Sequence, residues 1–220
     1  GLRERNFQIM DKRKAKKIYD ALHERYPDAH CALHYTSPLE LLFSTILSAQ
    51  ATDVGVNKAT PALFKAFPTV ESYTFASPEE IEPYISSIGL FRSKAKSLYT
   101  SANLIVDNFG GVVPDTMKDL LTLRGVARKT ANVVLGNAFK KNEGVVVDTH
   151  VGRLAQRFGI TTETTPVKIE KDLMALFPQK NWTMLSHLLV SHGRAVCKKR
   201  GDTCSDDSIC KRYCSNATTG

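Results

Sequence analysis

Leu123-Arg124-Gly125-Val126-Ala127-Arg128-Lys129-Thr130-Ala131 reads as a tight turn that enters a helix, and Asp148 follows nineteen residues after Lys129. A glycine lets the backbone approach another group closely, and successive N–H groups at a helix start can bind a phosphate. Such contacts hold a protein on a nucleic-acid backbone without reading its sequence. The alternative is an ordinary helix–helix turn that contains a glycine. The stretch therefore predicts two packed helices and a candidate phosphate-binding turn.

Lys129 and Asp148 are the candidates for chemistry in this region. A neutral lysine amine can attack an electrophilic carbon and form a Schiff base, and a helix N-terminus beside Arg128 favours the neutral form. The alternative is a solvated surface lysine, the usual fate of lysines. Asp148-Thr149 before a helical pattern is typical of an N-cap, which also holds a carboxylate in a fixed orientation. Each residue has both a structural and a chemical interpretation.

Helical patterns cover most of the chain and predict an all-α fold. Ser77-Pro78-Glu79-Glu80 is a strong helix start, with a serine cap, proline at the first position and acids in the first turn. The helix expected over Asp11–Arg25 carries one apolar face: Ala15, Ile18, Tyr19 and Leu22. Further helices are expected over residues 38–48, 54–67, 93–108, 115–121, 126–139, 150–158, 167–176 and 182–197. Composition alone marks no domain boundary.

The composition favours a globular protein with a polyanionic partner. A chain of 220 residues can form one large or two modest domains, and its 30 Lys+Arg against 22 Asp+Glu give a formal charge of +8. Many proteins are merely basic, so the charge is supporting evidence only. No run approaches the roughly 18 apolar residues of a membrane span, and the N-terminal segment has no apolar signal-peptide core. We therefore expect an intracellular protein with no membrane partner.

The cysteines gather near the C-terminal end, which suggests a metal or cluster site more than disulfides. Their spacing is Cys-x6-Cys-x5-Cys-x3-Cys, and the four residues are Cys197, Cys204, Cys210 and Cys214. Four thiolates in one 18-residue window suit a [4Fe–4S] cluster. Zinc is the main rival, although structural zinc sites usually bring closer cysteine pairs, and unligated thiols are the third interpretation. Basic residues around this segment suit phosphates or form only a solvated face.

Ordered motifs over nearly the whole chain resemble the endonuclease III family of helix-hairpin-helix (HhH-GPD) DNA glycosylases. The family pattern Leu-Pro-Gly-Val-Gly-x-Lys-Thr-Ala followed by Val-Asp-Thr-His is similar to Leu123–Ala131 and Val147–His150. Further similar blocks are Leu47–Asp53, Val56–Thr60, Ile88–Leu90, Ser93–Ala95 and His192–Arg194. So many blocks in the same order make a chance match very unlikely.

The resemblance implies two all-helical domains with DNA bound across a cleft. A central barrel domain would cover residues 31–141, with the helix-hairpin-helix at about 115–139. A second domain would join residues 1–30 to 142–220 and would carry the cluster loop over residues 197–214. Lys129 would attack C1′ of a damaged nucleotide, release the base and support strand cleavage by β-elimination, while Asp148 would assist departure of the base.

The resemblance also implies how DNA is held. Chemistry on a base inside a duplex requires flipping the nucleotide out, and Gln50 would fill the vacated space while Leu90 would wedge the opposite strand. The other implied DNA-binding residues are Asp53, Arg124, Gly125, Val126, Ala127, Arg128, Thr130 and His150. From the residues alone, Leu90 also reads as an ordinary core leucine, and Gln50 and Asp53 as local helix caps.

Departures from the family pattern affect the hairpin and the cluster loop, and one of them is Leu121 in place of an acid often found just before the hairpin. Arg124 stands where the hairpin usually has proline, which adds a cation near a phosphate. Ala127 replaces the second glycine, and alanine at a position that needs positive φ would cost about 1 kcal/mol or shift the turn. The family loop reads Cys-x6-Cys-x2-Cys-x5-Cys, and Asp207 sits at its third cysteine. We expect the cluster with altered loop geometry.

The function implied is that of a bifunctional DNA glycosylase and AP lyase of base excision repair for oxidised or ring-damaged pyrimidines. The partner would be damaged or abasic double-stranded DNA, bound by a monomer inside the cell, in the cytoplasm or nucleoid if the protein is bacterial. One alternative is an adenine-mismatch or other monofunctional glycosylase, although the adenine branch lacks the hairpin lysine. The other alternative is a non-catalytic helix-hairpin-helix DNA-binding module, against which Lys129 and Asp148 argue together.

Overall fold

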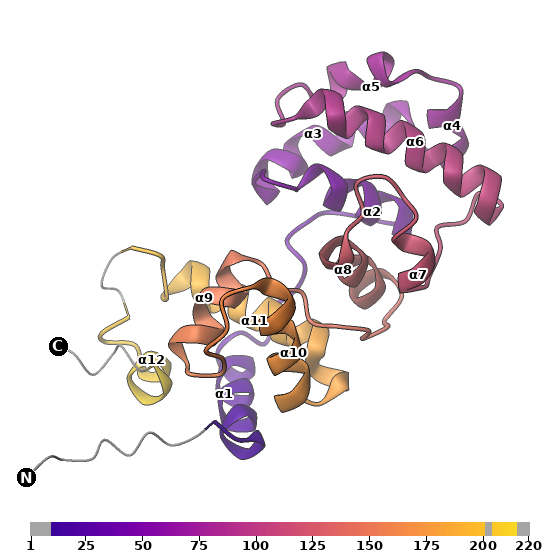
Figure 1. The fold of residues 1–220 in the computed structure, drawn as a ribbon. Coiled ribbons are helices and arrows are strands. Elements are labelled where there is room, and N and C mark those ends of the chain that lie inside the picture. Colours follow the sequence, from indigo (N-terminus) through magenta and orange to yellow (C-terminus); the bar gives the residue numbers. More distant parts are fainter. Residues whose placement is uncertain (1–9, 201–203, 215–220) are drawn as a thin grey trace, which may run out of the picture. The chain divides into compact units, whose positions relative to one another are not determined.

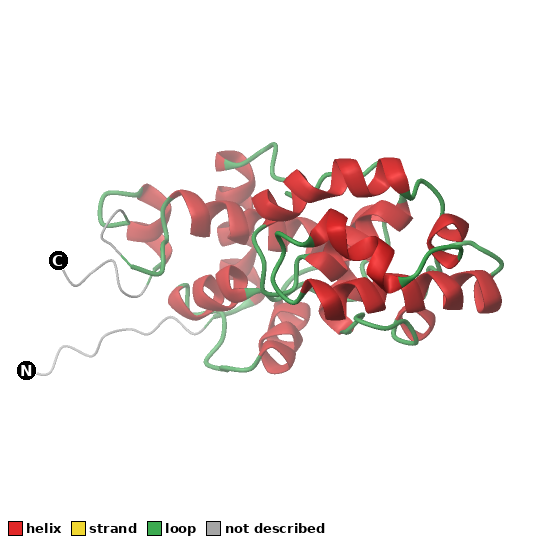
Figure 2. Cartoon of the chain, turned by 90° about the horizontal axis from the view of Figure 1, so that it is seen from above, coloured by secondary structure: helices red, strands yellow, loops and turns green. Residues whose placement is uncertain are grey.

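The regular secondary structure of the described part of the chain is helical. The computed structural model describes residues 10–200 and 204–214, and over these residues it contains helices and no strand (Figures 1 and 2). The predicted all-α fold is confirmed. Within these described segments, no helix is both long enough and apolar enough to cross a bilayer.

The chain divides into two compact units, which are described separately. Unit 2 covers Cys31–Glu143, and unit 1 joins Gly1–His30 to Gly144–Gly220. The described helices of unit 2 are α2 (Pro38–Leu47), α3 (Asp53–Ala66), α4 (Val70–Thr74), α5 (Pro78–Ile85), α6 (Phe91–Phe109), α7 (Met117–Leu120) and α8 (Arg128–Ala138). Those of unit 1 are α1 (Lys12–Arg25), α9 (Thr149–Arg157), α10 (Pro166–Leu176), the 3₁₀-helix η1 (Gln179–Asn181), α11 (Trp182–Ala195) and α12 (Ser208–Tyr213).

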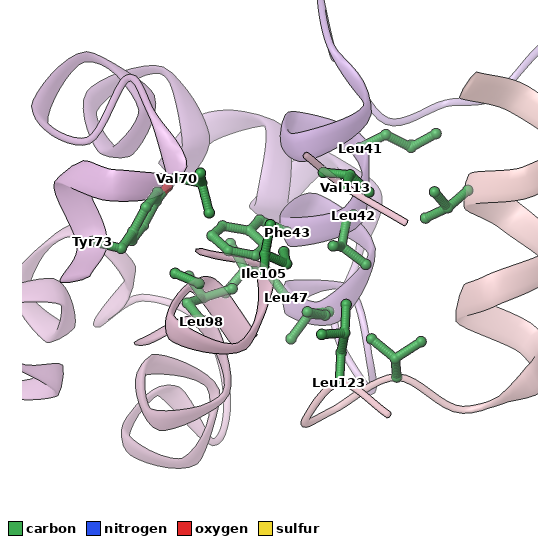
Figure 3. Packing of buried hydrophobic residues seen from close by; sticks show 14 of the residues in the cluster. Leu41, Leu42, Phe43, Leu47, Val70, Tyr73, Leu98, Ile105, Val113 and Leu123 are labelled. Atoms are coloured by element: carbon green, nitrogen blue, oxygen red, sulfur yellow. The ribbon is translucent and has the colours of Figure 1, made fainter. Parts of the chain in front are cut away.

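Unit 2 is built around α2, which is buried along nearly its whole length. α2 contacts α3, α6 and α8, and Figure 3 shows its Leu42, Phe43 and Leu47 among side chains of the surrounding elements. Phe43 meets Tyr73 edge to face, with ring centroids 4.9 Å apart. Leu123, from the turn between α7 and α8, is buried in the same cluster. The core therefore reaches directly under the hairpin turn.

Unit 1 has its own hydrophobic core around α11. The apolar face predicted for the first helix is confirmed, because all four of its residues are buried: Ala15, Ile18, Tyr19 and Leu22. α11 contacts α1 and α9. The buried cysteines Cys197, Cys210 and Cys214 belong to this core rather than to a loop outside it. Folding of unit 1 and assembly of the cysteine site are thus linked.

Helix boundaries follow the local sequence where a cap is present. The Ser77 side chain accepts from the N–H of Glu80, as its sequence context predicts. Asp148 caps α9 by accepting from the N–H of Val151 at 2.8 Å, so the N-cap interpretation is confirmed. Two α-helices escaped prediction, α4 and α12, with five and six residues. Both are too short for the helical period to repeat clearly.

Candidate functional site

The hairpin turn depends on Gly125, which has a φ of +82°. A Cβ at this position would lie 3.0 Å from the Ser97 hydroxyl oxygen and 3.3 Å from Cγ2 of Ile46. The turn thus needs glycine for two reasons, its left-handed backbone and the close approach of α6 and α2. Leu123 and Val126 on either side are buried. These contacts fix the turn on the core, while Gly125 itself stays exposed.

Ala127 does not carry the strain that its sequence position suggested. Its φ is −97° and its ψ 177°, an extended conformation that any residue adopts. The expected penalty for alanine was wrong because Gly125 alone takes the left-handed conformation in this turn. Ala127 is the N-cap of α8, which begins at Arg128 rather than Val126, and no side chain caps this helix. The first N–H groups of a helix have no intrahelical partner, so this end can accept an anion.

Lys129 lies in the first turn of α8 and is exposed, as are its neighbours Arg124 and Arg128. The Arg124 Nε donates to the Ser97 hydroxyl at 3.3 Å, and the Ser101 hydroxyl donates to the Arg124 carbonyl at 2.9 Å. The residue in the place of the family's proline is thus tied to α6 by its side chain and its backbone. Thr130 is half-buried one position after Lys129. Basic groups and helix N–H groups therefore surround an accessible amine.

Asp148 and His150 lie in unit 1, at the start of α9. Both are half-buried, and the Asp148 carboxylate is oriented by its bond to the N–H of Val151. His150 Nδ1 lies 3.0 Å from the Arg153 guanidinium. Gly193 of α11 packs closely on this pair, since a Cβ there would lie 3.0 Å from His150 Nδ1. The carboxylate is therefore held in a fixed direction on a rigid element.

Gln50 and Leu90 both occupy left-handed turns on unit 2, with φ of 56° and 59°. Leu90 is 63% exposed, so its interpretation as a core leucine was wrong. Gln50 is also exposed and lies after the end of α2. Asp53 is not the cap of α3, because Thr52 occupies that position and accepts from the N–H of Gly55. These two residues combine a strained backbone with an exposed side chain, so they are a candidate site for contact with another molecule.

Three of the four C-terminal cysteines are buried, namely Cys197, Cys210 and Cys214, and Cys204 is partly buried against the same core. These cysteines therefore do not form an exposed tail. A hydrogen bond from Cys210 and the nearby Arg157 guanidinium lower the pKa of Cys197 to about 6. Arg157 Nη1 lies 3.3 Å from this sulfur. Soft, buried donors with one thiol already biased toward thiolate fit an iron–sulfur cluster.

Asp207, at the position of the family's third cysteine, has a structural role instead. Its carboxylate accepts from the N–H groups of Ile209 at 2.9 Å and Cys210 at 3.0 Å, and so caps α12. The same carboxylate pairs with Arg25 of α1 at 2.7 Å. Burial raises the pKa of Asp207, but the Arg25 hydrogen bond and the Cys210 N–H outweigh it and hold the pKa below its ordinary value. This residue therefore fixes the helix that carries Cys210.

Sequence reasoning missed His192 as a neighbour of the cysteines. Its ring is fully buried, with Nε2 3.2 Å from Cys210 Sγ and Nδ1 2.6 Å from the Tyr26 hydroxyl. Burial lowers the pKa of this imidazole. Ligand atoms of His192, Asp207 and Cys210 lie within 4.8 Å of one another, a spacing that a single metal ion could also use. The sequence signal was the His192-Gly193-Arg194 block, which the resemblance alone singled out.

A hairpin turn followed by an exposed lysine on an all-helical scaffold defines a class of DNA repair protein. The model of HhH-GPD superfamily base excision DNA repair proteins matches residues 43–179. Endonuclease III of Synechocystis sp. is 50% identical over 89% of this chain and 89% of its own length. Endonuclease III of Escherichia coli K12 is 36% identical over 92% of this chain and 97% of its own.

Solved structures agree with these relatives. A non-covalent endonuclease III–DNA complex matches with a TM-score of 0.89 and 36% identity, over 94% of this chain and 97% of that one. A trapped endonuclease III–DNA covalent intermediate matches equally well, with a TM-score of 0.89. The chain therefore belongs to the endonuclease III family of the HhH-GPD superfamily. It is a bifunctional DNA glycosylase and AP lyase of base excision repair.

Proposed function

We propose that Lys129 is the nucleophile of this glycosylase and lyase and that the substrate is an oxidised or ring-damaged pyrimidine in double-stranded DNA. The observation that carries the proposal is the exposed lysine in the first turn of α8, directly after the Gly125 turn. Its amine attacks C1′ of the damaged nucleotide as the bond from C1′ to the base breaks. The C1′–O4′ bond of the sugar ring then opens to give the protonated Schiff base, which acidifies the C2′–H. Loss of that proton expels the 3′ phosphate by β-elimination and so cleaves the strand on the 3′ side.

Asp148 assists departure of the base in this proposal. Its carboxylate is oriented by the N–H of Val151. A fixed negative charge stabilises positive charge that develops on the sugar, and a carboxylate can also relay protons. Its capping bond serves both roles, because a cap fixes direction without neutralising the charge.

The hairpin and the two left-handed turns bind the duplex. The start of α8 offers N–H groups to a phosphate, with Gly125, Val126 and Ala127 in the turn and Arg124, Arg128 and Thr130 around it. Gln50 fills the space of the flipped nucleotide and Leu90 enters the opposite strand. Asp53 and His150 complete the proposed DNA-binding set. The exposure of Leu90 and the left-handed backbone of Gln50 support these roles.

We further propose that the C-terminal cysteines hold a [4Fe–4S] cluster. Cys197, Cys210 and Cys214 supply buried donors, and Cys204 supplies the fourth. Cys197 lies just after α11, and Cys210 and Cys214 lie in and at the end of α12, so a cluster held by these residues would act as a structural element of unit 1. Iron and sulfide in about a four-to-one ratio to protein support this proposal. Zinc in their place refutes it and favours a site at His192, Asp207 and Cys210.

The domain assignment accompanies these roles. We assign residues 31–141 to the barrel domain, with the hairpin at about 115–139, and residues 1–30 with 142–220 to the domain that carries the cluster loop. The enzyme acts as a DNA-associated monomer inside the cell, on DNA with damaged bases or abasic sites. Gel filtration with light scattering tests the monomer directly.

Borohydride trapping on abasic duplex DNA tests the nucleophile. The wild-type protein is expected to form a covalent adduct, and Lys129→Gln to lose it, because glutamine has no amine that can form a Schiff base. Asp148→Asn is expected to lose base excision while it still traps an abasic site that has been made beforehand. A wild-type protein without any adduct would favour a non-catalytic DNA-binding module. A Lys129→Gln variant that traps as well as wild type would place the nucleophile on another residue.

A further inference from the structure

Two strained turns on unit 2 share one point of attachment. Among the described residues, the non-glycine residues with positive φ are Gln50, Leu90 and Lys140. A non-glycine residue in this conformation costs about 1 kcal/mol or more, and it persists only where its surroundings hold it there. Lys140 follows the end of α8, whereas Gln50 and Leu90 belong to exposed turns. Something other than their own side chains must therefore hold these two backbones.

Lys94 contacts both turns. Its backbone N–H donates to the Leu90 carbonyl at 3.0 Å, within the first turn of α6. Its Nζ donates to the Ala49 carbonyl at 2.7 Å. The Ala49 carbonyl belongs to the peptide plane just before Gln50, and the Leu90 carbonyl to the plane just after Leu90. One residue therefore fixes a peptide plane next to each of the two left-handed residues.

The burial of Lys94 is unusual for a lysine. Only 6% of its surface is exposed, whereas Arg92 and Lys96 on the same helix are exposed. Lysine is almost never fully buried unless its charge has a partner, and burial lowers the pKa of this ammonium. The charge lies just beyond the end of α2, where the helix dipole and the Ala49 carbonyl favour a cation. A buried ammonium here makes a bond that a neutral side chain of the same length could not.

We propose that Lys94 is a positioning residue that couples the Gln50 turn to the Leu90 turn, so that both side chains enter the duplex together as the damaged nucleotide leaves it. This inference rests on the proposed roles of Gln50 and Leu90. Without the ammonium, the Ala49–Gln50 peptide can rotate and Gln50 can leave its left-handed conformation. Leu90 keeps its place at the start of α6, so the two wedges no longer act in register.

The test compares Lys94→Met with Lys96→Met, which removes the same charge from an exposed site on the same helix. Two substrates carry the same damaged pyrimidine, one in a fully paired duplex and one in a single strand that needs no wedge. On the paired substrate, Lys94→Met is expected to lower the single-turnover excision rate about 10- to 100-fold, the cost of a small misplacement of a positioning group. On the single strand, the excision rate of Lys94→Met is expected to match that of Lys96→Met.

A spectroscopic signature separates positioning from general damage. 2-Aminopurine placed beside the lesion becomes fluorescent as the helix opens, and Lys94→Met is expected to reduce this rise. In a Gln50→Ala background, the further loss from Lys94→Met should shrink toward none, because the group that it positions is gone. The proposed coupling is wrong if Lys94→Met lowers the excision rate equally on both substrates. It is also wrong if Lys94→Met and Lys96→Met have the same excision rate on the paired duplex.

Two controls keep the outcome interpretable. Borohydride trapping of a single-stranded abasic site reports Lys129 alone, so its failure in the wild type counts against the proposed function and not against the coupling. The thermal transition of each variant shows whether it folds. Should Lys94→Met not fold, Lys94→Gln, which keeps a donor without the charge, is measured in its place, with the same paired-to-single-strand ratio as the deciding value.

Discussion

The turns of unit 2 that we propose to bind DNA and the cysteine end of unit 1 combine function and packing in opposite ways. In unit 2, Gln50, Leu90 and Lys129 are exposed, and buried neighbours such as Leu123 hold the backbone beneath them. In unit 1, the side chains that we assign to the cluster, among them Cys197 and Cys210, are themselves part of the core.

This difference teaches which substitutions separate activity from stability. Functional residues on turns over a rigid scaffold can be changed without unfolding the protein, because few buried contacts depend on them. A ligand that lies inside the core serves both roles, so its loss removes packing and metal together. The two regions should therefore respond differently to equally conservative changes.

The largest effect is expected at the cysteine end. Cys210→Ser keeps the size of the side chain but removes a proposed soft ligand beside His192. If Cys210 holds the proposed cluster, the variant should lose bound iron and about 2 to 4 kcal/mol of stability. Denaturant unfolding and iron analysis measure the two losses. Cys31→Ser is the matched control, since Cys31 is a partly buried thiol of the other unit. Equal stability of the two variants would remove the link between cluster and core.

The hairpin turn should show the next largest effect. Gly125→Ala places a Cβ 3.0 Å from the Ser97 hydroxyl and strains a backbone with φ of +82°, so about 1 to 3 kcal/mol of stability should be lost. Duplex binding at low salt should weaken with it, because the turn shifts. Gly89→Ala is the control for stability, since a Cβ there meets nothing within 4 Å. A Gly125→Ala protein as stable as Gly89→Ala would contradict the turn geometry.

Ala127→Ser lies in the same turn but is expected to raise the stability of the protein rather than lower it. Ala127 is the uncapped start of α8, and a serine there can accept from a first-turn N–H and stabilise the protein by about 1 kcal/mol. Thermal unfolding measures the gain. If this position needed positive φ, Ala127→Gly would stabilise and Ala127→Ser would not.

The smallest effect belongs to a surface ion pair between the start of the hairpin and the segment just after it. Lys141 Nζ lies 3.0 Å from the Asp115 carboxylate, and this hydrogen bond lowers the pKa of Asp115 below its ordinary value. A carboxyl whose pKa is lower in the folded protein than in the unfolded protein stabilises the fold at a pH above its unfolded-state pKa. That stabilisation is lost as the pH falls through its folded-state pKa. Because the group is exposed, Asp115→Asn should differ little from wild type at neutral pH and not at all in acid. A large difference at neutral pH would show that the pair matters more than its exposure suggests.

Local signals in the sequence predict the parts of the fold that depend on near neighbours. The buried face of α1 and the caps at Ser77 and Asp148 follow from period and cap chemistry, and the structure confirms them. The short helix α12 was missed because its six residues do not repeat the helical period, and its Asp207 cap is also held by Arg25, which is far away in the sequence.

The sequence predicts which residues belong to the candidate site better than it predicts their backbone conformations and contacts. Lys129 and Gly125 of the hairpin can be identified from the sequence. Which residue takes a positive φ, however, depends on how the turn packs against Ser97 and Ile46. Ala127 was therefore misjudged. The contact of Lys94 with Ala49 joins residues 45 positions apart, and no local pattern reports it.

Peptide mapping of the borohydride-trapped adduct tests the central claim most directly. The wild-type protein is trapped on an abasic duplex and digested, and mass spectrometry locates the modified residue. We expect a single adduct on Lys129, carried by the peptide that begins the α8 helix, and no adduct in the Lys129→Gln protein. An adduct on another lysine or on the N-terminal amine, retained in Lys129→Gln, would contradict the assignment of the nucleophile.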